Sequence, residues 1–321
     1  MKRYILRRVF HAAALLILVS FLSFAFLRLA PGNYTDAMRL DPRVSAQTVA
    51  AWRSRYGLDR PLIMQYASWL HSAARGEFGF SFGYGIPVGS LLWPRIKNTL
   101  LLTTAAAAIS WLFALLLGIG VAASRNRAFD NMVQTAMSLL HSIPDLLIGL
   151  ALLVVAVRSG KFPIGGMEGR APGSFGQGAA DMAAHLALPV LALVLVGLPV
   201  LVRHVQAAVR ELMDAPFVQA ARGHGVPRRR LWMVYTLPAA ANPIISLFGY
   251  SIGGLLSSSL LIEVIMGWPG LGPMLLEAIF SRDIHVVIGA TLASALFLIA
   301  GNLIADLLLY AADPRIRQES G

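Results

Sequence analysis

The sequence predicts an all-α polytopic membrane protein with six transmembrane helices and both termini in the cytoplasm. Three observations support this class. Of the 321 residues, 57% are hydrophobic and 13% are charged, and the mean hydropathy is +0.66, whereas a soluble domain has about a quarter of its residues charged. Six apolar runs are each long enough to cross a bilayer core as a helix. Basic residues are denser in one set of connecting segments than in the other.

The first apolar run, 9–30, follows a basic start at Lys2, Arg3, Arg7 and Arg8. It is as long as a membrane span and has no small-residue cleavage site before Arg28, so we interpret it as a transmembrane helix and not as a signal peptide. The other apolar runs are 99–123, 132–157, 186–202, 239–262 and 286–309. We therefore expect a first helix within 1–30, a periplasmic helical segment at 31–98, a transmembrane core at 99–310 and a cytoplasmic tail at 311–321.

The distribution of basic residues predicts the orientation. If the N-terminus is inside, the inner segments hold 14 Lys and Arg in 64 residues, and the outer segments hold 12 in 119. The longest outer segment, 31–98, is of a length that crosses the membrane regardless of charge. The net charge of +11 does not indicate nucleic-acid binding, because the basic residues lie between apolar spans and not on a polar face.

The outer segments differ in character. Aromatic and apolar residues with helical spacing predict two short helices in 31–98, one over 49–56 and one over 62–73. The Gly-rich loop 158–185 is expected to have little regular structure. The last outer loop, 263–273, contains three glycines and two prolines beside Trp268, and we expect it to fold back against the helices.

The segment 203–238 is the longest charged segment between apolar runs, and the distribution of basic residues predicts that it is a cytoplasmic loop. Asp214 is predicted to cap a helix whose first turn holds Ala215 and Pro216 and which ends at Gly225 and Pro227. Such a helix has about ten residues. Its members Phe217, Val218, Ala220 and Ala221 are expected on one side. A short helix with small residues in its middle is suited to a partner's groove.

The same segment carries a family resemblance. Its pattern consists of Gln219-Ala220-Ala221, then three residues, then Gly225, then nine residues, then Tyr235-Thr236-Leu237-Pro238. This pattern resembles the EAA loop of ABC-importer permeases. Gln219 replaces the usual Glu, and Tyr235 replaces an aliphatic residue. The dipeptide/oligopeptide/nickel branch is the most similar, and the resemblance extends along the chain through Gly57–Leu62, Gly76–Gly79, Glu263, Trp268–Gly272, Arg282-Asp283 and Asp313–Arg317.

The resemblance implies a type I ABC importer permease fold. It implies a permease subunit for binding-protein-dependent import of dipeptides, oligopeptides or a related small solute across the bacterial inner membrane. The implied partners are a second homologous permease, two cytoplasmic ABC ATPase subunits, an extracytoplasmic substrate-binding protein and the lipid bilayer. The ATPase-coupling residues are then Phe217, Val218, Gln219, Ala220, Ala221, Arg222 and Gly225.

Enzymatic chemistry is not expected of this chain. It has no Gly-x4-Gly-Lys-Ser/Thr motif, so ATP and Mg are expected on the partner ATPases and no cofactor on this chain. Its seven histidines are scattered, without a His-Glu-x-x-His motif, and we expect no metal site. Gly249-Tyr250-Ser251-Ile252-Gly253 matches a hydrolase nucleophile elbow, but apolar helix is predicted on both sides, so its Gly-x-x-x-Gly spacing favours close helix packing.

Polar residues in and near the spans are candidates for the translocation path. These are His141, Ser142 and Asp145 around Pro144, together with Ser257 and Ser258. Pro144 frees a backbone carbonyl and is expected to kink the third span. Two readings of Asp145 stay open: it lines the pathway if it is central, and it pairs locally if it is near an interface. The resemblance implies that a further set of residues forms a periplasmic gate or contacts the binding protein. These are Glu263, Trp268, Pro269, Gly270 and Asp283.

An ion-coupled secondary transporter acting alone is the alternative function, and a membrane enzyme is a third. A secondary transporter predicts several buried acids or broken helices in repeated halves. Only Asp145 and Asp306 lie within apolar runs, and no repeat is visible. Copurification of an ATPase would separate the permease from both alternatives.

Overall fold

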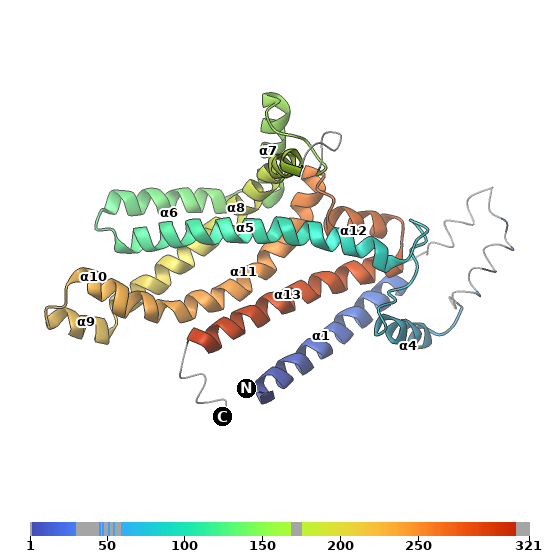
Figure 1. Cartoon of the computed structure of the whole chain (residues 1–321), viewed down its shortest axis with the longest axis horizontal. Helices are drawn as coiled ribbons and strands as arrows, with labels where there is room; N and C mark the ends of the chain where they lie inside the picture. The colour runs from blue at the N-terminus through green and yellow to red at the C-terminus, as the bar shows by residue number, and fades with distance from the viewer. Residues whose placement is uncertain are drawn as a thin grey trace. The chain divides into compact units, whose positions relative to one another are not determined.

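The computed structural model describes residues 2–29, 59–167 and 175–312, together with the isolated positions Ser45, Gln47, Ala51 and Ser54. Apart from Ala51 and Ser54, the predicted outer helix at 49–56 lies outside the described residues. Of the predicted tail 311–321, residues 311 and 312 belong to the last helix and the rest lies outside the described residues. The described elements are α1 (Lys2–Leu29), α4 (Leu62–Ala73), α5 (Val88–Ala123), α6 (Arg127–Ser142), α7 (Asp145–Ser159), α8 (Phe175–Met213), α9 (Pro216–Gly223), α10 (Arg228–Arg230), the π-helical η1 (Leu231–Thr236), α11 (Leu237–Met266), α12 (Leu271–Phe280) and α13 (Ile284–Ala312) (Figure 1).

The predicted all-α membrane class is confirmed. Within the described residues, five helices are long and apolar enough to span a membrane, and there are six spans if the bent pair of α6 and α7 counts as one. Several helices are longer than the apolar runs that predicted them. The helix α8 has 39 residues, whereas the apolar run was 186–202. The expectation of little regular structure in 158–185 is wrong from Phe175 onward, and the helix also continues from 203 to Met213. Alanines in the first of these extensions, and Ala, Gln, Arg and Glu in the second, favour helix, although neither extension is apolar enough to be detected by hydropathy.

The predicted third span, 132–157, is not one helix. It is broken between Ser142 and Asp145, and α6 and α7 are bent by 95° at this point. The sequence predicted only a kink, and the change of direction is larger because a residue before proline is driven out of the α conformation. Ile143 accordingly takes φ −84° and ψ 124°, and Pro144 takes φ −58° and ψ 142° as the N-cap of α7.

The chain folds as two compact units. Unit 1 contains residues 1–8, 100–268 and 297–321, and unit 2 contains residues 9–99 and 269–296. In unit 1, α8 is the central helix and packs against α6, α7 and α11. A buried apolar cluster joins α5, α6, α8, η1 and α11 around Trp111, Val202 and Trp232. A second cluster includes Leu193, Ile262 and Trp268.

Small residues set the distance between α11 and α13 in unit 1. A β-carbon added to Gly249 would lie 2.7 Å from the β-carbon of Ala305, and one added to Gly301 would lie 2.7 Å from Ile252. The predicted Gly-x-x-x-Gly packing is thus confirmed for Gly249 and Gly253, since a β-carbon on Gly253 would lie 2.5 Å from a Leu298 methyl.

The nucleophile-elbow pattern lies inside a continuous helix, as predicted. Ser251 is in the middle of α11 and is buried. Its hydroxyl donates to the carbonyl of Phe248 over 2.8 Å and accepts a hydrogen bond from Trp111 Nε1 over 3.0 Å. A helical serine of this kind lacks the strand-to-helix turn that an elbow requires.

In unit 2, an aromatic core joins α1, α4 and α13. Phe24, Tyr66, Trp69 and Ile288 are buried together. The Tyr66 hydroxyl lies 2.9 Å from Ser20 Oγ, and Trp69 Nε1 donates to the carbonyl of Phe78 over 3.1 Å. The predicted helix at 62–73 is therefore confirmed as α4.

One ion pair within unit 1 joins the two ends of the described chain. Arg8 Nη2 lies 2.7 Å from Asp306 Oδ1, and the side chain of Asp306 is 15% exposed. Asp306 therefore has a partner inside the chain. The pair holds the start of α1 beside α13.

Candidate coupling segment and transmembrane cavity

The helix α9 forms within the segment that the sequence singled out, but its cap differs. It begins at Pro216, its N-cap is Ala215, and no side chain caps it. The predicted capping role of Asp214 is wrong, because Pro216 forces Ala215 into an extended conformation, φ −64° and ψ 145°. Ala215 therefore takes the cap position, and Asp214 lies one residue too early.

The end of α9 is close to its prediction. The helix has eight residues and ends at Gly223, somewhat before the expected position. Gly225 then has φ +76°, a conformation that glycine adopts without strain. This turn lets Val226 N–H donate to the carbonyl of Ala221 over 3.2 Å, which satisfies one of the helix's last carbonyls.

The side chains of α9 face in two directions. Val218 is fully buried, whereas Phe217 is 46% exposed. The prediction that both lie on one side is wrong: Val218 packs inside the chain and is not available to a partner. Gln219, Ala220, Arg222 and Gly225 are exposed and Ala221 is half-buried. Phe217, Ala220 and Ala221 form a stripe at helical spacing, which we call the outer stripe.

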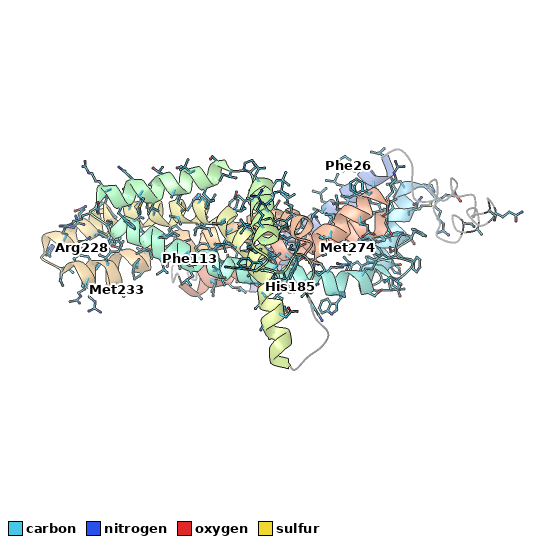
Figure 2. All side chains as sticks on the ribbon, turned by 90° about the horizontal axis from the view of Figure 1, so that it is seen from above. Phe26, Phe113, His185, Arg228, Met233 and Met274 are labelled. Atoms are coloured by element: carbon cyan, nitrogen blue, oxygen red, sulfur yellow. The ribbon has the colours of Figure 1, made fainter. Side chains whose placement is uncertain are left out.

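Contacts on the inner side fix α9 to unit 1. The helix packs against η1 and the end of α8. Thr236 is buried in η1, and its hydroxyl lies 3.4 Å from Met213 Sδ on α8. Arg228 Nη2 donates to the carbonyl of Ala123 at the end of α5 over 2.7 Å. Arg228 and Met233 lie at the same end of unit 1 (Figure 2). The outer stripe therefore projects from an anchored helix.

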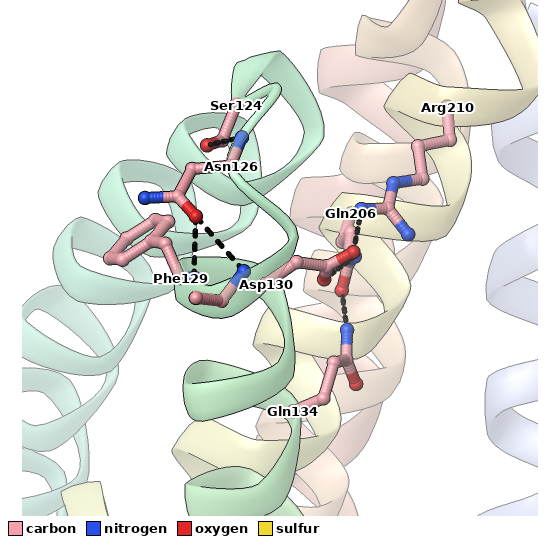
Figure 3. Close-up of polar contacts among 8 residues, drawn as sticks. Ser124, Asn126, Phe129, Asp130, Gln134, Gln206 and Arg210 are labelled. Carbon is pink, nitrogen blue, oxygen red and sulfur yellow. Dashed lines mark hydrogen bonds and ion pairs between the residues drawn. The ribbon is translucent and has the colours of Figure 1, made fainter.

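A polar network beside this segment was not predicted. Asp130 Oδ2 lies 2.6 Å from Arg210 Nη2, and Asp130 Oδ1 accepts a hydrogen bond from Gln206 Nε2 over 3.3 Å (Figure 3). Gln134 donates to Gln206, whose side chain is buried. Asn126 starts α6 by accepting from Ala128 N–H over 2.9 Å. The network ties the start of α6 to the last turns of α8.

Its signal in the sequence was the i, i+4 spacing of two pairs, Asp130 with Gln134 and Gln206 with Arg210. This spacing places each pair on one helix face. It was not recognised because Gln206 and Arg210 lie beyond the apolar run 186–202 and were assigned to a cytoplasmic loop. In the structure both belong to α8.

A cavity of about 400 Å³ lies in unit 1 where α6 and α7 meet at their break. Four of the five residues predicted for the translocation path line it, namely His141, Ser142, Asp145 and Ser258. The fifth, Ser257, is exposed and is not among the lining residues, because it lies about 100° round α11 from Ser258. The rest of the lining is mostly apolar and comes from α8, α11 and the break itself with its flanking residues Leu140 and Ile148.

Asp145 lines the cavity and also has a local partner. Ser258 Oγ donates to Asp145 Oδ2 over 2.7 Å. The carboxylate is half-buried in the first turn of α7. Ser142 donates instead to the carbonyl of Leu139 over 2.7 Å, one turn back in α6.

The predicted periplasmic residues divide between the two units. In unit 1, Glu263 and Trp268 are buried, and Trp268 N–H donates to the carbonyl of Glu263 over 2.9 Å. In unit 2, the carbonyl of Pro269 accepts from Asn98 Nδ2 over 2.7 Å, and Gly270 is the N-cap of α12. These contacts fold the loop back within each unit, as predicted.

Asp283 is also buried, in unit 2. Its Oδ2 accepts from Ser81 Oγ over 2.6 Å and from Gly83 N–H over 3.0 Å. Its Oδ1 lies 3.4 Å from Val286 N, in the position of a cap for α13. The side chains of Asp283, Glu263 and Trp268 therefore belong to the interior of the chain.

Comparison with known proteins identifies the family. A family model described as "Binding-protein-dependent transport system inner membrane component" matches residues 114–318, and a model of the N-terminal part of such components matches residues 1–100. The chain belongs to this family. It is a multi-pass membrane component of a transport system and not itself an enzyme, and it works with ATPase and substrate-binding components.

The chain is similar over its whole length to curated permeases. It is 31% identical to the oligopeptide transport system permease protein AppB of Bacillus subtilis, over 98% of this chain and 99% of that protein. It is 29% identical to the dipeptide transport system permease protein DppB of Escherichia coli, over 99% of this chain and 100% of that protein. The family and these relatives favour the permease over an ion-coupled transporter acting alone.

Solved structures support the same fold. A chain of the MetNI methionine ABC transporter in an inward-facing conformation matches with a TM-score of 0.53 and 16% identity, covering 70% of this chain and 96% of that chain. This likeness identifies the type I ABC importer permease fold for the permease.

Proposed function

We propose that this permease carries peptides or a related small solute across the bacterial inner membrane as one subunit of an ATP-driven importer. Its proposed partners are a second homologous permease, two cytoplasmic ABC ATPases and an extracytoplasmic binding protein. The names of AppB and DppB support the substrate class. The observation that carries the coupling role is the outer stripe on α9, exposed on a helix that Val218 anchors.

The predicted coupling residues each have a proposed part in ATPase docking. Phe217, with 46% of its surface exposed, fills a pocket of the ATPase. Ala220 and Ala221 leave room for close approach of the two backbones. Gln219 and Arg222 are exposed and make polar contacts. Gly225 contributes by turning the chain away after the helix. Val218 transmits force from α9 to α8 and η1.

The proposed mechanism follows from differential affinity. Closure of the ATPase pair around ATP and Mg moves α9, and the ATPases, not this chain, bind both ligands. The closed pair must bind the outward-open permease more tightly than the inward-open one, or ATP would not shift the equilibrium. The network of Asp130, Gln206 and Arg210 links α8 to α6, so a movement of α9 reaches the broken span.

The cavity at the α6–α7 break is the proposed part of the translocation path within this chain. It is lined by His141, Ser142, Asp145 and Ser258. Its volume of about 400 Å³ lies in the range of small-molecule sites. Non-helical backbone at membrane depth is tolerated where it lines a cavity, which is the situation of Ile143 and Pro144.

The test is ATP hydrolysis and peptide uptake by the reconstituted importer in proteoliposomes. We compare Ala220→Asp, on the outer stripe, with Ala128→Asp, the same change on the exposed first turn of α6. We expect Ala220→Asp to lower binding-protein-stimulated hydrolysis at least tenfold, because a charge is buried without a partner on docking, an effect of roughly 2 kcal/mol or more. Ala128→Asp should be unaffected. Uptake without any ATPase would reject the proposal.

A further inference from the structure

The cavity at the α6–α7 break has an uneven distribution of charge. Among the described residues that line it, Asp145 is the only Asp, Glu, Lys or Arg, and His141 is the only histidine. Among the described residues, Asp145 forms no ion pair, and its bonding partner is the neutral hydroxyl of Ser258. The cavity therefore presents a carboxylate whose charge is not matched by a neighbouring cation.

The setting makes that charge unusual. Most of the lining is aliphatic, from residues such as Leu140, Val200 and Leu255. A carboxylate inside a membrane span is costly unless it is paired or faces a wet cavity. The hydrogen bond from Ser258 satisfies one lone pair of Oδ2 and leaves the other oxygen available for a donor.

We propose that Asp145 binds a primary ammonium group of the transported solute as it passes through this chain. An ammonium group has three N–H donors and one positive charge, so it takes the free carboxylate oxygen and supplies the missing charge. Ser258 Oγ, which already donates to Asp145, keeps its lone pairs for a second N–H of the same group.

The remaining polar lining fits a solute with an ammonium at one end. Tyr250 lines the cavity with 73% of its surface exposed, and the face of its ring attracts a cation. The aliphatic residues of the cavity accommodate small side chains. A peptide N-terminus and a lysine side chain both carry the required group. This inference rests on the proposed function, because it assumes that a solute enters the cavity.

The experiment measures binding to the assembled complex of permeases and ATPases without the binding protein, so that only the membrane part selects. Equilibrium dialysis compares three radiolabelled probes: dialanine, N-acetyl-dialanine and N-acetyl-alanyl-lysine. The variants are Asp145→Asn, which keeps the shape of the side chain, and Ser257→Ala, a control one residue from Ser258 and outside the lining.

We expect wild type to bind dialanine at least about tenfold more tightly than N-acetyl-dialanine, the size of one charge-assisted hydrogen bond. Asp145→Asn should remove this preference, and Ser257→Ala should keep it. Binding of N-acetyl-alanyl-lysine like dialanine means that any primary ammonium is accepted, whereas binding like N-acetyl-dialanine restricts the site to the N-terminus.

Two results would overturn the inference. One is equal binding of dialanine and its acetylated form to wild type. This comparison uses only the wild-type protein, so it does not depend on whether a variant folds. The other is an unchanged preference in Asp145→Asn. Peptide uptake with coupled ATP hydrolysis, measured on the same preparation, separates the two proposals: if it persists, only the ammonium site is rejected, and if wild type shows none, the proposed import function fails.

Discussion

The buried carboxylate of Asp283 allows a quantitative prediction. Replacing Asp283 with alanine leaves Ser81 Oγ and Gly83 N–H without the acceptor that they reach over 2.6 and 3.0 Å. A hydrogen bond to a charged group contributes about 1.5–3 kcal/mol. Since the two bonds share one oxygen and are not additive, we expect Asp283→Ala to cost about 3 kcal/mol. Asp283→Asn, which can still place an oxygen at the same point, should cost about 1 kcal/mol.

The assay is hydrogen–deuterium exchange of the 79–88 segment in detergent, together with the thermal unfolding midpoint. A loss of 3 kcal/mol raises the exchange rate of the Gly83 amide about a hundredfold. Glu77→Ala, an exposed acidic residue in the same outer segment, is the matched control and should change neither quantity. If Asp283→Ala leaves exchange unchanged but weakens binding-protein affinity, our assignment of Asp283 to the interior is wrong.

Three further predictions follow from the packing and the electrostatics. Gly254 lines the cavity and has open space where a β-carbon would lie, so Gly254→Leu should block uptake without unfolding the protein. Gly120 is equally open but lies away from the cavity, so Gly120→Leu should leave uptake unchanged. Equal uptake by both variants would exclude the cavity from the path. Gly249→Val should lower stability by about 1–3 kcal/mol, seen as a lower thermal midpoint, because its β-carbon would lie 2.7 Å from a β-carbon of α13. Burial, followed by the hydrogen bond to Glu277, raises the pKa of Tyr84 to about 12. The raised pKa therefore stabilises the fold below the ordinary value of 10.0, and this contribution is lost as the pH rises through about 12. Phenolate absorbance, taken as the difference from Tyr84→Phe, should show the late titration, and Glu277→Gln should bring it earlier; an unshifted Tyr84 would contradict the contact.

The spans were predictable because the length of an apolar run can be read directly from the sequence. Hydropathy failed at helix ends, because α8 continues to Met213 through polar residues that hydropathy treats as a loop. The break at Pro144 was anticipated only as a kink, because the direction of α7 depends on packing with α8 and α11 and not on the proline itself.

The candidate sites were predicted unequally. The segment of α9 was found from its helix start and stop signals and from its resemblance, but the different burial of Phe217 and Val218 depends on tertiary contacts with η1. His141 and Asp145 were found because polar residues are rare in apolar runs. The bond from Ser258 to Asp145 joins residues 113 positions apart, and a single sequence gives no sign of such a pairing.

The two faces of α9 also bear on how importers diversify. The face that contains Val218 is committed to the permease's own interior, so changes there are removed because the protein no longer folds. The outer stripe is less constrained by the chain, because Phe217 and Ala220 are exposed and Ala221 is half-buried. Under the proposed docking role, duplicated permeases can therefore acquire different ATPases through a few substitutions at Phe217, Ala220 and Ala221, while the rest of the transporter is inherited unchanged.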